Sequence, residues 1–390
     1  MQRDPTEQAT GVAPGVEVLL TDSLQLIRGK RVGLITNQSG RDRRGTSTID
    51  LLYHAPGVRL TALFGPEHGL RGVAKAGESV SSATDTATGV PIYSLYGETN
   101  APTADMMRDV DVLVYDIQDV GARVYTYEWT MALSAQAAGK LGKKFIVLDR
   151  PDPIRGDRVD GNVLDSRFRS FVGQYPVALR YGLTAGELLR YLVGTGQVTA
   201  DIAVVPMRGW RRSMWWDETK IPWVNPSPNL RSLDATLLYP GTVFFEGTNA
   251  TEGRGTDKPF QLIGADWLTD AGAIAREMNA LALPGVHFDS TSRTIEQGGG
   301  YKFGGKSIPM IDISLTDRNA VRPVDVGVRL LRALYERHRA EWQWRPSIDR
   351  LAGTDELRHA VESGTIDVLL AKWAREAAEW QNQTRPYWIY

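Results

Sequence analysis

The first half of the chain repeats one pattern, in which a short apolar run is followed by a polar loop and then by a helical pattern. The apolar runs cover residues 31–36, 58–64, 91–96, 110–117, 144–148 and 202–206. Helical patterns cover residues 46–54, 127–139 and 184–193. The last of these begins with a capping box of Thr184 and Glu187. Because parallel strands are joined by crossover helices, this alternation predicts a mostly parallel sheet with helices on both faces.

The alternation stops near residues 195–210, which indicates a domain boundary. The chain has 390 residues, more than one ordinary domain holds, so we expect two domains. The later patterns predict helices near residues 265–283, 324–342 and 365–380, and strands around residues 286–289 and 309–315. We therefore predict an α/β domain over residues 15–205 and a smaller α+β domain over residues 206–390.

The composition excludes several classes of protein. The chain has 45 basic and 46 acidic side chains, so its net charge of −1 offers no field of one sign to hold nucleic acid. It has no cysteine, which excludes disulfides, zinc thiolate sites and thiol nucleophiles. No run of about 18 apolar residues predicts a membrane span, and the first residues lack the apolar stretch of a signal peptide. Nothing in the sequence indicates an oligomeric state.

Motifs for common cofactors and nucleophiles are missing as well. No GxGxxG follows the first strand, and neither a phosphate-binding GxxxxGK(S/T) loop nor the metalloprotease pattern HExxH occurs. There is no GxSxG nucleophile elbow. The five histidines are not spaced as metal ligands. We therefore predict neither a cofactor nor a metal.

Polar residues follow four of the predicted strands. In an open parallel sheet, ligands bind beyond the carboxyl ends of the strands, and those ends share one edge. Tyr127, just downstream of the strongest strand, could contact the same ligand. We therefore predict a ligand site at this edge, built from Asn37, Glu67, His68, Asp116, Gln118, Asp119, Arg123, Asp149 and Arg150.

Three carboxyl groups at this edge are candidates for acid–base chemistry. Glu67 leaves a buried strand on a stiff loop, where partial desolvation would raise the pKa of its carboxyl and suit it as a general acid. Asp116 and Asp119 could activate water or stabilise an oxocarbenium-like centre. Alternatively, Glu67 caps a turn or pairs with Arg71, and the two aspartates form salt bridges with neighbouring arginines.

A second group of candidates lies in the loop-rich stretch from 225 to 256, which is dense in Pro, Gly, Asn and Glu. A loop that is this costly to order usually exists for binding. Arg254 could bind a carboxylate in bidentate fashion. The alternative is a scaffold that connects the two domains. The candidates in this stretch are Asn229, Glu246, Asn249, Glu252 and Arg254.

Several longer strings resemble one family of enzymes. They are GPEHGLRG (65–72), DIQDVGARVYTY (116–127), DRPDPIRG (149–156), PSPNL (226–230), YPGTVFFEGTNATEGRGTDKPF (239–260) and the KFGG and LTDR region (302–318). Together they resemble the NamZ family of exo-β-N-acetylmuramidases from about residue 15 to the C-terminus. The resemblance implies a Rossmann-like N-terminal domain, a smaller α+β domain and a cleft between them.

The resemblance also implies an activity and a location. Members remove the terminal β-1,4-linked N-acetylmuramic acid from the non-reducing end of peptidoglycan fragments, and they work outside the cytoplasm. The carboxylate that Arg254 could bind would then be the lactyl group of this sugar. The family's usual DRPNP is DRPDP here, with Asp152 in place of Asn.

Site roles follow from the resemblance residue by residue. Glu67 matches the proposed catalytic acid. Asp116 or Asp119, and after them Glu246 or Glu252, are candidates for the second carboxylate, which the acetamido group of the substrate could replace. The remaining matches are substrate-binding positions, namely His68, Gln118, Arg123, Tyr127, Asn249 and Arg254.

Two other functions stay open at this point. A metal-dependent hydrolase would use Asp116, Asp119 and Asp149 as ligands and would be sensitive to chelators. A non-catalytic muropeptide-binding protein would close on its ligand without cleaving it. Neither needs a different fold, so the sequence alone does not separate them.

Overall fold

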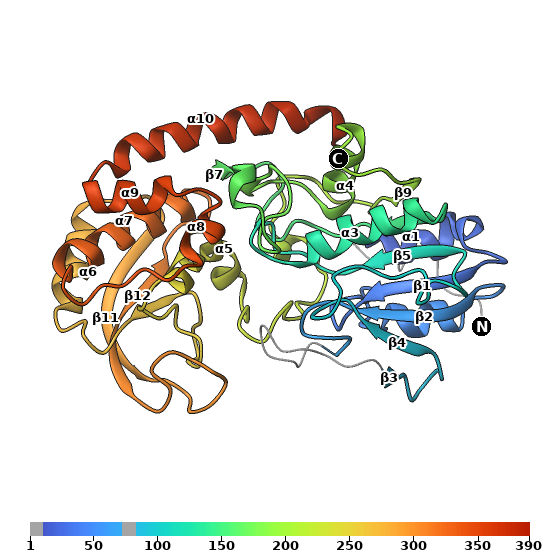
Figure 1. Cartoon of the computed structure of the whole chain (residues 1–390), viewed down its shortest axis with the longest axis horizontal. Helices are drawn as coiled ribbons and strands as arrows, with labels where there is room; N and C mark the ends of the chain where they lie inside the picture. The colour runs from blue at the N-terminus through green and yellow to red at the C-terminus, as the bar shows by residue number, and fades with distance from the viewer. Residues whose placement is uncertain (1–10, 72–82) are drawn as a thin grey trace.

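A computed structural model describes residues 11–71 and 83–390, and these residues form a seven-stranded, a three-stranded and a two-stranded sheet with helices packed around them (Figure 1). The larger sheet has seven strands in the order β3–β4–β2–β1–β5–β6–β9. All neighbouring strands in it are parallel except β3 and β4. The strands are β1 (Arg31–Thr36), β2 (Arg59–Gly65), β3 (Ala83–Thr84), β4 (Pro91–Ser94), β5 (Val112–Asp116), β6 (Lys144–Leu148) and β9 (Ile202–Val205).

Alternating side chains of the strands bury two separate cores against helices on the two faces. In β5, Val112 and Val114 join one core and Leu113 and Tyr115 join the other. The first core packs against α1 (Gly15–Asp22) and α2 (Thr48–Tyr53), and the second against α3 (Tyr127–Lys140) and α4 (Ala185–Gly194). The predicted α/β class with a mostly parallel sheet is therefore confirmed. We call this part of the chain the sheet domain.

The predicted start of α4 is confirmed in detail. Thr184 Oγ1 accepts a hydrogen bond from Glu187 N at 3.2 Å, and Thr184 N donates to Glu187 Oε2 at 3.1 Å. Such a reciprocal pair satisfies two of the free N–H groups at a helix start. Helix α1 and the antiparallel pair β7 (Asp160–Val163) and β8 (Ala178–Arg180) were not among the predicted elements.

The rest of the chain forms the second domain around an antiparallel sheet in the order β10–β12–β11. Its strands are β10 (Leu262–Gly264), β11 (Val286–Thr294) and β12 (Ser307–Leu315). Its helices are α5 (Leu233–Thr242), α6 (Ala271–Ala280), α7 (Pro323–Arg337), α8 (Ile348–Ala352), α9 (Glu356–Ser363) and α10 (Ile366–Thr384). This confirms the predicted smaller α+β part, whereas the boundary at 205/206 stays a prediction.

Helix α5 lies inside the stretch that we expected to be loop, between the candidate residues Asn229 and Glu246. Ser232 caps it by accepting a hydrogen bond from Ala235 N. The helix then packs closely on α7, because a Cβ added at Gly327 would lie 2.2 Å from the carbonyl oxygen of Gly241. Only glycine allows this approach. The contact holds the residues after α5 against the body of the second domain.

Helix α10 connects the two domains along one side of the molecule (Figure 1). Trp380 Nε1 donates to the carbonyl oxygen of Tyr181 at 2.9 Å, and Val163 N donates to Glu376 Oε2 at 3.1 Å. Beyond the helix, Tyr390 Oη donates to Asp149 Oδ2 at 2.8 Å, at the end of β6. The C-terminal residues of the chain are therefore part of the structure of the sheet domain.

A buried ion pair lies at the topological switch point of the sheet and fills most of the crevice there. Leaving aside β3, the strand order is that of a Rossmann fold, and the connections reverse direction between β1 and β5. Here Arg150 Nε and Nη2 bind the two carboxylate oxygens of Asp116 at 2.5 and 3.0 Å. Asp116 is fully buried and Arg150 is 3% exposed. A cavity of about 30 Å³ is the space that remains beside them.

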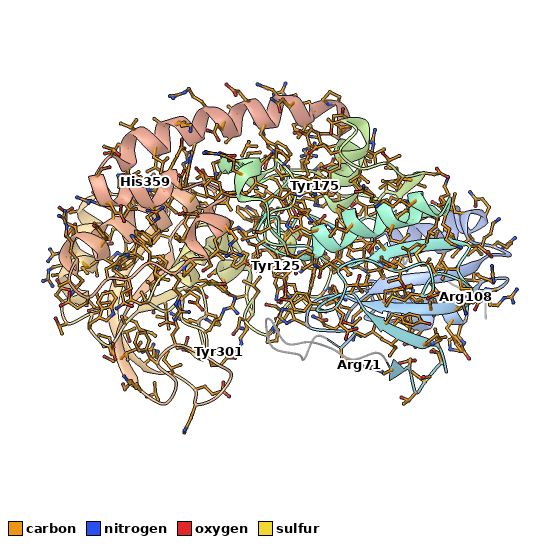
Figure 2. All side chains as sticks on the ribbon, in the orientation of Figure 1. Arg71, Arg108, Tyr125, Tyr175, Tyr301 and His359 are labelled. Carbon is orange, nitrogen blue, oxygen red and sulfur yellow. The ribbon has the colours of Figure 1, made fainter. Side chains whose placement is uncertain are left out.

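The Arg150→Met substitution tests how much the fold depends on this pair. It leaves Asp116 as an uncompensated buried charge, so we expect a loss of about 3–5 kcal/mol in the free energy of unfolding. Urea unfolding followed by circular dichroism measures it. The control is Arg108→Met, at the outer end of the sheet domain (Figure 2), which breaks an exposed pair with Asp105 and should cost less than about 1 kcal/mol. Equal losses in the two variants would contradict this account.

Candidate active site

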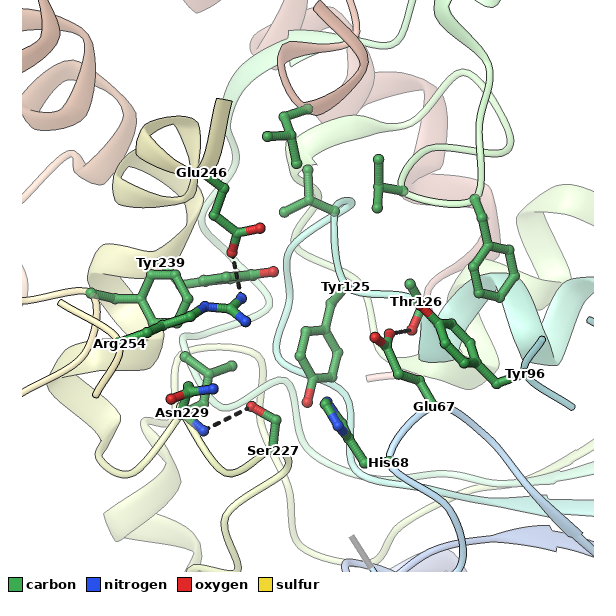
Figure 3. A pocket seen from close by; sticks show the side chains of 16 residues that line it. Glu67, His68, Tyr96, Tyr125, Thr126, Ser227, Asn229, Tyr239, Glu246 and Arg254 are labelled. Carbon is green, nitrogen blue, oxygen red and sulfur yellow. Dashed lines mark hydrogen bonds and ion pairs between the residues drawn. The ribbon is translucent and has the colours of Figure 1, made fainter. Parts of the chain in front are cut away.

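A cavity of about 310 Å³ lies between the sheet domain and the second domain (Figure 3). The sheet domain contributes residues that follow β2, β4 and β5, and the second domain contributes residues from the stretch around α5 and from α8. Five predicted site residues line it, namely Glu67, His68, Asn229, Glu246 and Arg254. The predicted cleft between two domains is therefore present, and residues far apart in the sequence meet there.

The loop after β2 brings Glu67 to the cavity through a strained turn. Gly69 N donates to the carbonyl oxygen of Pro66 at 2.9 Å, which closes the turn. His68 has a φ of 69°, in the left-handed region that favours glycine, and it is only 5% exposed. Such a conformation costs about 1–3 kcal/mol and persists only where the surroundings hold it. The turn thus fixes Glu67 and His68 at the cavity wall.

Two hydroxyl groups surround the carboxyl group of Glu67. Thr126, just before α3, donates from Oγ1 to Glu67 Oε2 at 2.7 Å. Tyr96, which follows β4, lies on the same wall (Figure 3). Burial and, after it, the neighbouring charge of Glu67 together raise the pKa of Tyr96 to about 12. The Tyr96 hydroxyl therefore stays protonated at neutral pH.

The opposite wall carries a charge network from the second domain (Figure 3). Arg254 Nη2 binds Glu246 Oε1 at 2.5 Å, and Arg254 Nε lies 3.2 Å from Glu252 Oε1. Lys302 Nζ lies 3.1 Å from Glu252 Oε2 and also donates to two backbone carbonyl oxygens. Burial raises the pKa of Glu246, and the charge of Arg254 opposes this shift. The network holds both glutamates in place.

Aromatic rings form the floor between the two walls. Tyr239 packs edge-on against Phe260, with ring centroids 4.8 Å apart, and against Tyr125 at 6.0 Å. Tyr125 lies where the two domains meet (Figure 2). Phe171 lines the cavity on the sheet-domain side. Aromatic faces suit the C–H groups of a sugar ring, so the cavity combines apolar surface with a few fixed polar groups, as small-molecule sites do.

The cavity described above is the first lobe of a larger site. A second lobe of about 210 Å³ adjoins it. The two lobes share Asn229, Glu246 and Arg254 as lining residues. The second lobe is completed by Pro228, Glu252, Gly299, Gly300, Tyr301, Lys302 and Arg345. Both lobes together form one site, with Glu67 in the first lobe and the basic residues toward the second.

Three predicted aspartates lie outside the lining and have structural partners. Asp116 binds Arg150, as described above. Asp119 accepts from Gly121 N at 2.7 Å and from the Tyr181 hydroxyl, and burial raises its pKa to about 6. Asp149 accepts from Thr184 Oγ1 and Gly186 N at the start of α4, and burial raises its pKa to about 7. The spacing that predicted them in the site also fits these partners.

Other predicted binding residues likewise have partners within the protein and do not line the cavity. Arg123 is fully buried and donates to the carbonyl oxygens of Asn162, Val177 and Ala352, so it ties the sheet domain to α8. Tyr127 donates to the carbonyl oxygen of Pro226, and Asn249 donates to that of Glu341. Asn37 accepts a hydrogen bond from Ser39. Gln118 and Arg150 border the small cavity at the switch point.

The cavity also contains residues that the sequence analysis missed. Tyr96 follows β4 at the same sheet edge, so the strand-end argument could have found it. Thr126 directly precedes α3, in a string that the family resemblance already included. Phe171 and Arg345 carry no comparable signal, because only the packing of distant segments brings them to the site.

The described residues contain no group of three or more His, Asp or Glu side chains arranged to hold a metal ion. Asp116, Asp119 and Asp149, the ligands of the metal-dependent alternative, therefore do not form such a group. Among the helices that the structure describes, none is long and apolar enough to span a membrane.

A Rossmann-type sheet domain, a smaller α+β domain and a cavity with glutamates on facing walls and aromatic rings between them fit a two-domain glycoside hydrolase. Comparison with known families identifies which one. The family model described as "Exo-beta-N-acetylmuramidase NamZ, N-terminal" matches residues 32–234, and the one described as "Exo-beta-N-acetylmuramidase NamZ, C-terminal" matches residues 237–390. The chain belongs to the NamZ family of exo-β-N-acetylmuramidases.

Individual relatives agree with this assignment. The chain is 40% identical to the peptidoglycan β-N-acetylmuramidase NamZ of Bacillus subtilis (strain 168) over 391 residues, covering 100% of this chain and 94% of the relative. Two crystal structures of DUF1343 family proteins from Bacteroides fragilis are also similar. One is 33% identical with a TM-score of 0.89, covering 97% of this chain and 99% of its own. The other is 29% identical with a TM-score of 0.80, covering 98% and 99%.

The Asp152→Asn substitution tests a place where the chain departs from the family pattern. Asp152 Oδ1 accepts from Ile154 N at 3.0 Å, whereas Oδ2 has no hydrogen-bond partner within residues 11–71 and 83–390. Burial raises the pKa of this carboxyl to about 8. Because the folded-state pKa lies above the unfolded value of about 3.9, the stability that the protonated carboxyl contributes is lost as pH rises toward about 8. We expect the variant to gain stability relative to the parent from about pH 4 to about pH 8, and to keep that gain at higher pH.

Thermal unfolding midpoints at several pH values check this expectation. The exposed substitution Asp289→Asn serves as the control and should follow the parent protein. A constant difference between Asp152→Asn and the parent across the pH range would show that the Asp152 carboxyl does not titrate with folding.

Proposed function

We propose that the cavity hydrolyses the β-1,4 bond of a terminal N-acetylmuramic acid at the non-reducing end of peptidoglycan fragments, with Glu67 as general acid. The observation that carries this proposal is the pair of Glu67 and Glu246. They are the two carboxylates among the described residues that line the first lobe, and they lie on opposite walls (Figure 3). Two carboxyl groups that flank a sugar are the usual machinery of glycoside hydrolysis.

Glu67 is suited to protonate the leaving oxygen. Cleavage of the bond between the anomeric carbon and the glycosidic oxygen leaves negative charge on that oxygen, and a proton from the Glu67 carboxyl neutralises it. Thr126 Oγ1 donates to Glu67 Oε2 and so fixes the orientation of this carboxyl group at the cavity wall. The resulting carboxylate can then take a proton from the water that completes hydrolysis.

Glu246 is the second carboxylate of this proposal, in preference to Asp116 and Asp119, which lie outside the lining. Arg254 holds Glu246 at 2.5 Å and keeps it in one orientation. Its negative charge can stabilise the positive charge that develops at the anomeric centre. The acetamido oxygen of the substrate remains available to attack the anomeric carbon, so Glu246 need not form a covalent bond.

The Glu67→Gln substitution tests the role of the acid through the leaving group. The wild type should release N-acetylmuramic acid from a MurNAc–GlcNAc disaccharide and 4-nitrophenol from the corresponding β-muraminide. In Glu67→Gln we expect kcat/KM to fall about 10²- to 10⁴-fold on the disaccharide, because a sugar hydroxyl needs the proton. The loss should be smaller on the nitrophenyl substrate, because nitrophenolate leaves without one.

Three controls accompany this measurement. EDTA should not change the rate, and the matching β-N-acetylglucosaminide should be a poor substrate. An equal loss on both leaving groups would contradict a role for Glu67 as general acid. Tight binding of the disaccharide by a folded wild type without any turnover would instead support a muropeptide-binding protein.

The Glu246→Gln substitution tests the second carboxylate. It removes the charge that faces the anomeric centre but keeps the shape of the side chain, and Arg254 retains its contact with Glu252. We expect kcat to fall by at least about tenfold on both leaving groups alike, because charge stabilisation is needed whatever group leaves. Steady-state kinetics measure this. The exposed Glu379→Gln is the matched control, and a Glu246→Gln variant with unchanged kcat would overturn the assignment.

A further inference from the structure

The second lobe has more positive than negative charge. Among the described residues that line it, the basic ones are Arg254, Lys302 and Arg345, and the acidic ones are Glu246 and Glu252. The first two cations are held by the two glutamates at 2.5–3.2 Å. This leaves Arg345 as the basic residue of the lobe without an acidic partner.

Arg345 is free to bind a ligand from solvent. Its side chain is exposed and forms no ion pair or side-chain hydrogen bond with the described residues, while its backbone N–H donates to Gly247 O at 2.8 Å. Burial lowers the pKa of the Lys302 amine, and the nearby charge of Arg345 acts in the same direction. Lys302 and Arg345 are neighbouring cations, and Glu252 is the carboxylate paired with Lys302. An anion between the two cations is therefore favoured.

The junction of the two lobes has an unused polar atom. Asn229 is 5% exposed and lines both lobes, and its Oδ1 has no hydrogen-bond partner among the residues that the structure describes. A buried acceptor without a donor is costly, so a ligand N–H or O–H at the junction would satisfy it. A sugar in the first lobe, with a substituent that passes Asn229, would therefore occupy both lobes.

We infer that the second lobe is the specificity subsite for the carboxylate of the 3-O-lactyl group, and that Arg345 is the residue that binds it. The inference rests on the proposed function. N-acetylmuramic acid differs from N-acetylglucosamine only by this lactyl ether, so a site that selects the first must recognise the added group. Arg254, which the sequence analysis considered for this role, already binds two glutamates and has the positioning role instead.

The test combines two variants with two substrates. Arg345→Met removes the charge and keeps most of the stem, and Arg345→Lys restores a charge. The substrates are the 4-nitrophenyl β-muraminide with a free lactyl acid and its neutral lactyl amide. The exposed Arg350→Met, in the same segment but outside both lobes, is the matched control.

We expect Arg345→Met to lower kcat/KM about tenfold on the free acid and to leave the amide nearly unchanged, with partial recovery in Arg345→Lys. The wild type should itself prefer the acid by a similar factor. Unchanged activity on the acid, or an equal loss on both substrates, would overturn the assignment of Arg345. Failure of the wild type to cleave either muraminide would instead overturn the proposed function and this inference with it.

Discussion

The ion pair between Arg150 and Asp116 determines where this fold can bind a ligand. In open parallel sheets the crevice between strands of opposite connection direction is the usual ligand site. Here the guanidinium and carboxylate fill that crevice, and Thr48 adds a further hydroxyl to Asp116 from α2. The cavity has moved to the neighbouring tips of β2 and β4 and to the loop before α3. There the sheet domain alone is open, so the second domain is needed to close it.

The two walls of the cavity are held in different ways. On the sheet-domain side, the backbone conformation of His68 and the hydroxyl of Thr126 determine the position of Glu67. On the opposite side, ion pairs determine the positions of Glu246 and Glu252. The first wall therefore depends on the local chain, and the second depends on the balance of charge among largely buried side chains. Hydrolysis of one glycosidic bond requires catalytic groups that are held rigidly on both sides of it.

Much of the fold could be predicted from the sequence, because strand and helix periods are local properties. The runs that became β1, β5 and β6 are buried on both faces and therefore nearly continuous in apolar residues. The helix α5 was missed because Pro240 and Gly241 indicate a loop, whereas close packing against Gly327 makes this helix stable. Local rules do not include such a contact.

The site could be predicted only in part. Glu67 and Arg254 line the cavity as expected. In the sequence, however, the polar residues that follow the other strands look the same as Glu67. Asp149 follows a strand just as Glu67 does, yet it caps the start of α4. Whether a carboxylate caps a helix or faces a ligand depends on which element lies opposite, and that is a property of tertiary structure.

The position of the C-terminal residues has a consequence for how the protein is made. A chain leaves the ribosome from its N-terminus, and domains usually fold in that order. In this protein, Ile389 N donates to Glu187 Oε1, and the Tyr390 hydroxyl donates to Asp149, both near the start of α4. The part of the sheet domain around α4 is therefore completed only after Ile389 and Tyr390 have left the ribosome. Completion of the sheet domain is then coupled to synthesis of the second domain, whose elements lie between α4 and these two residues in the sequence.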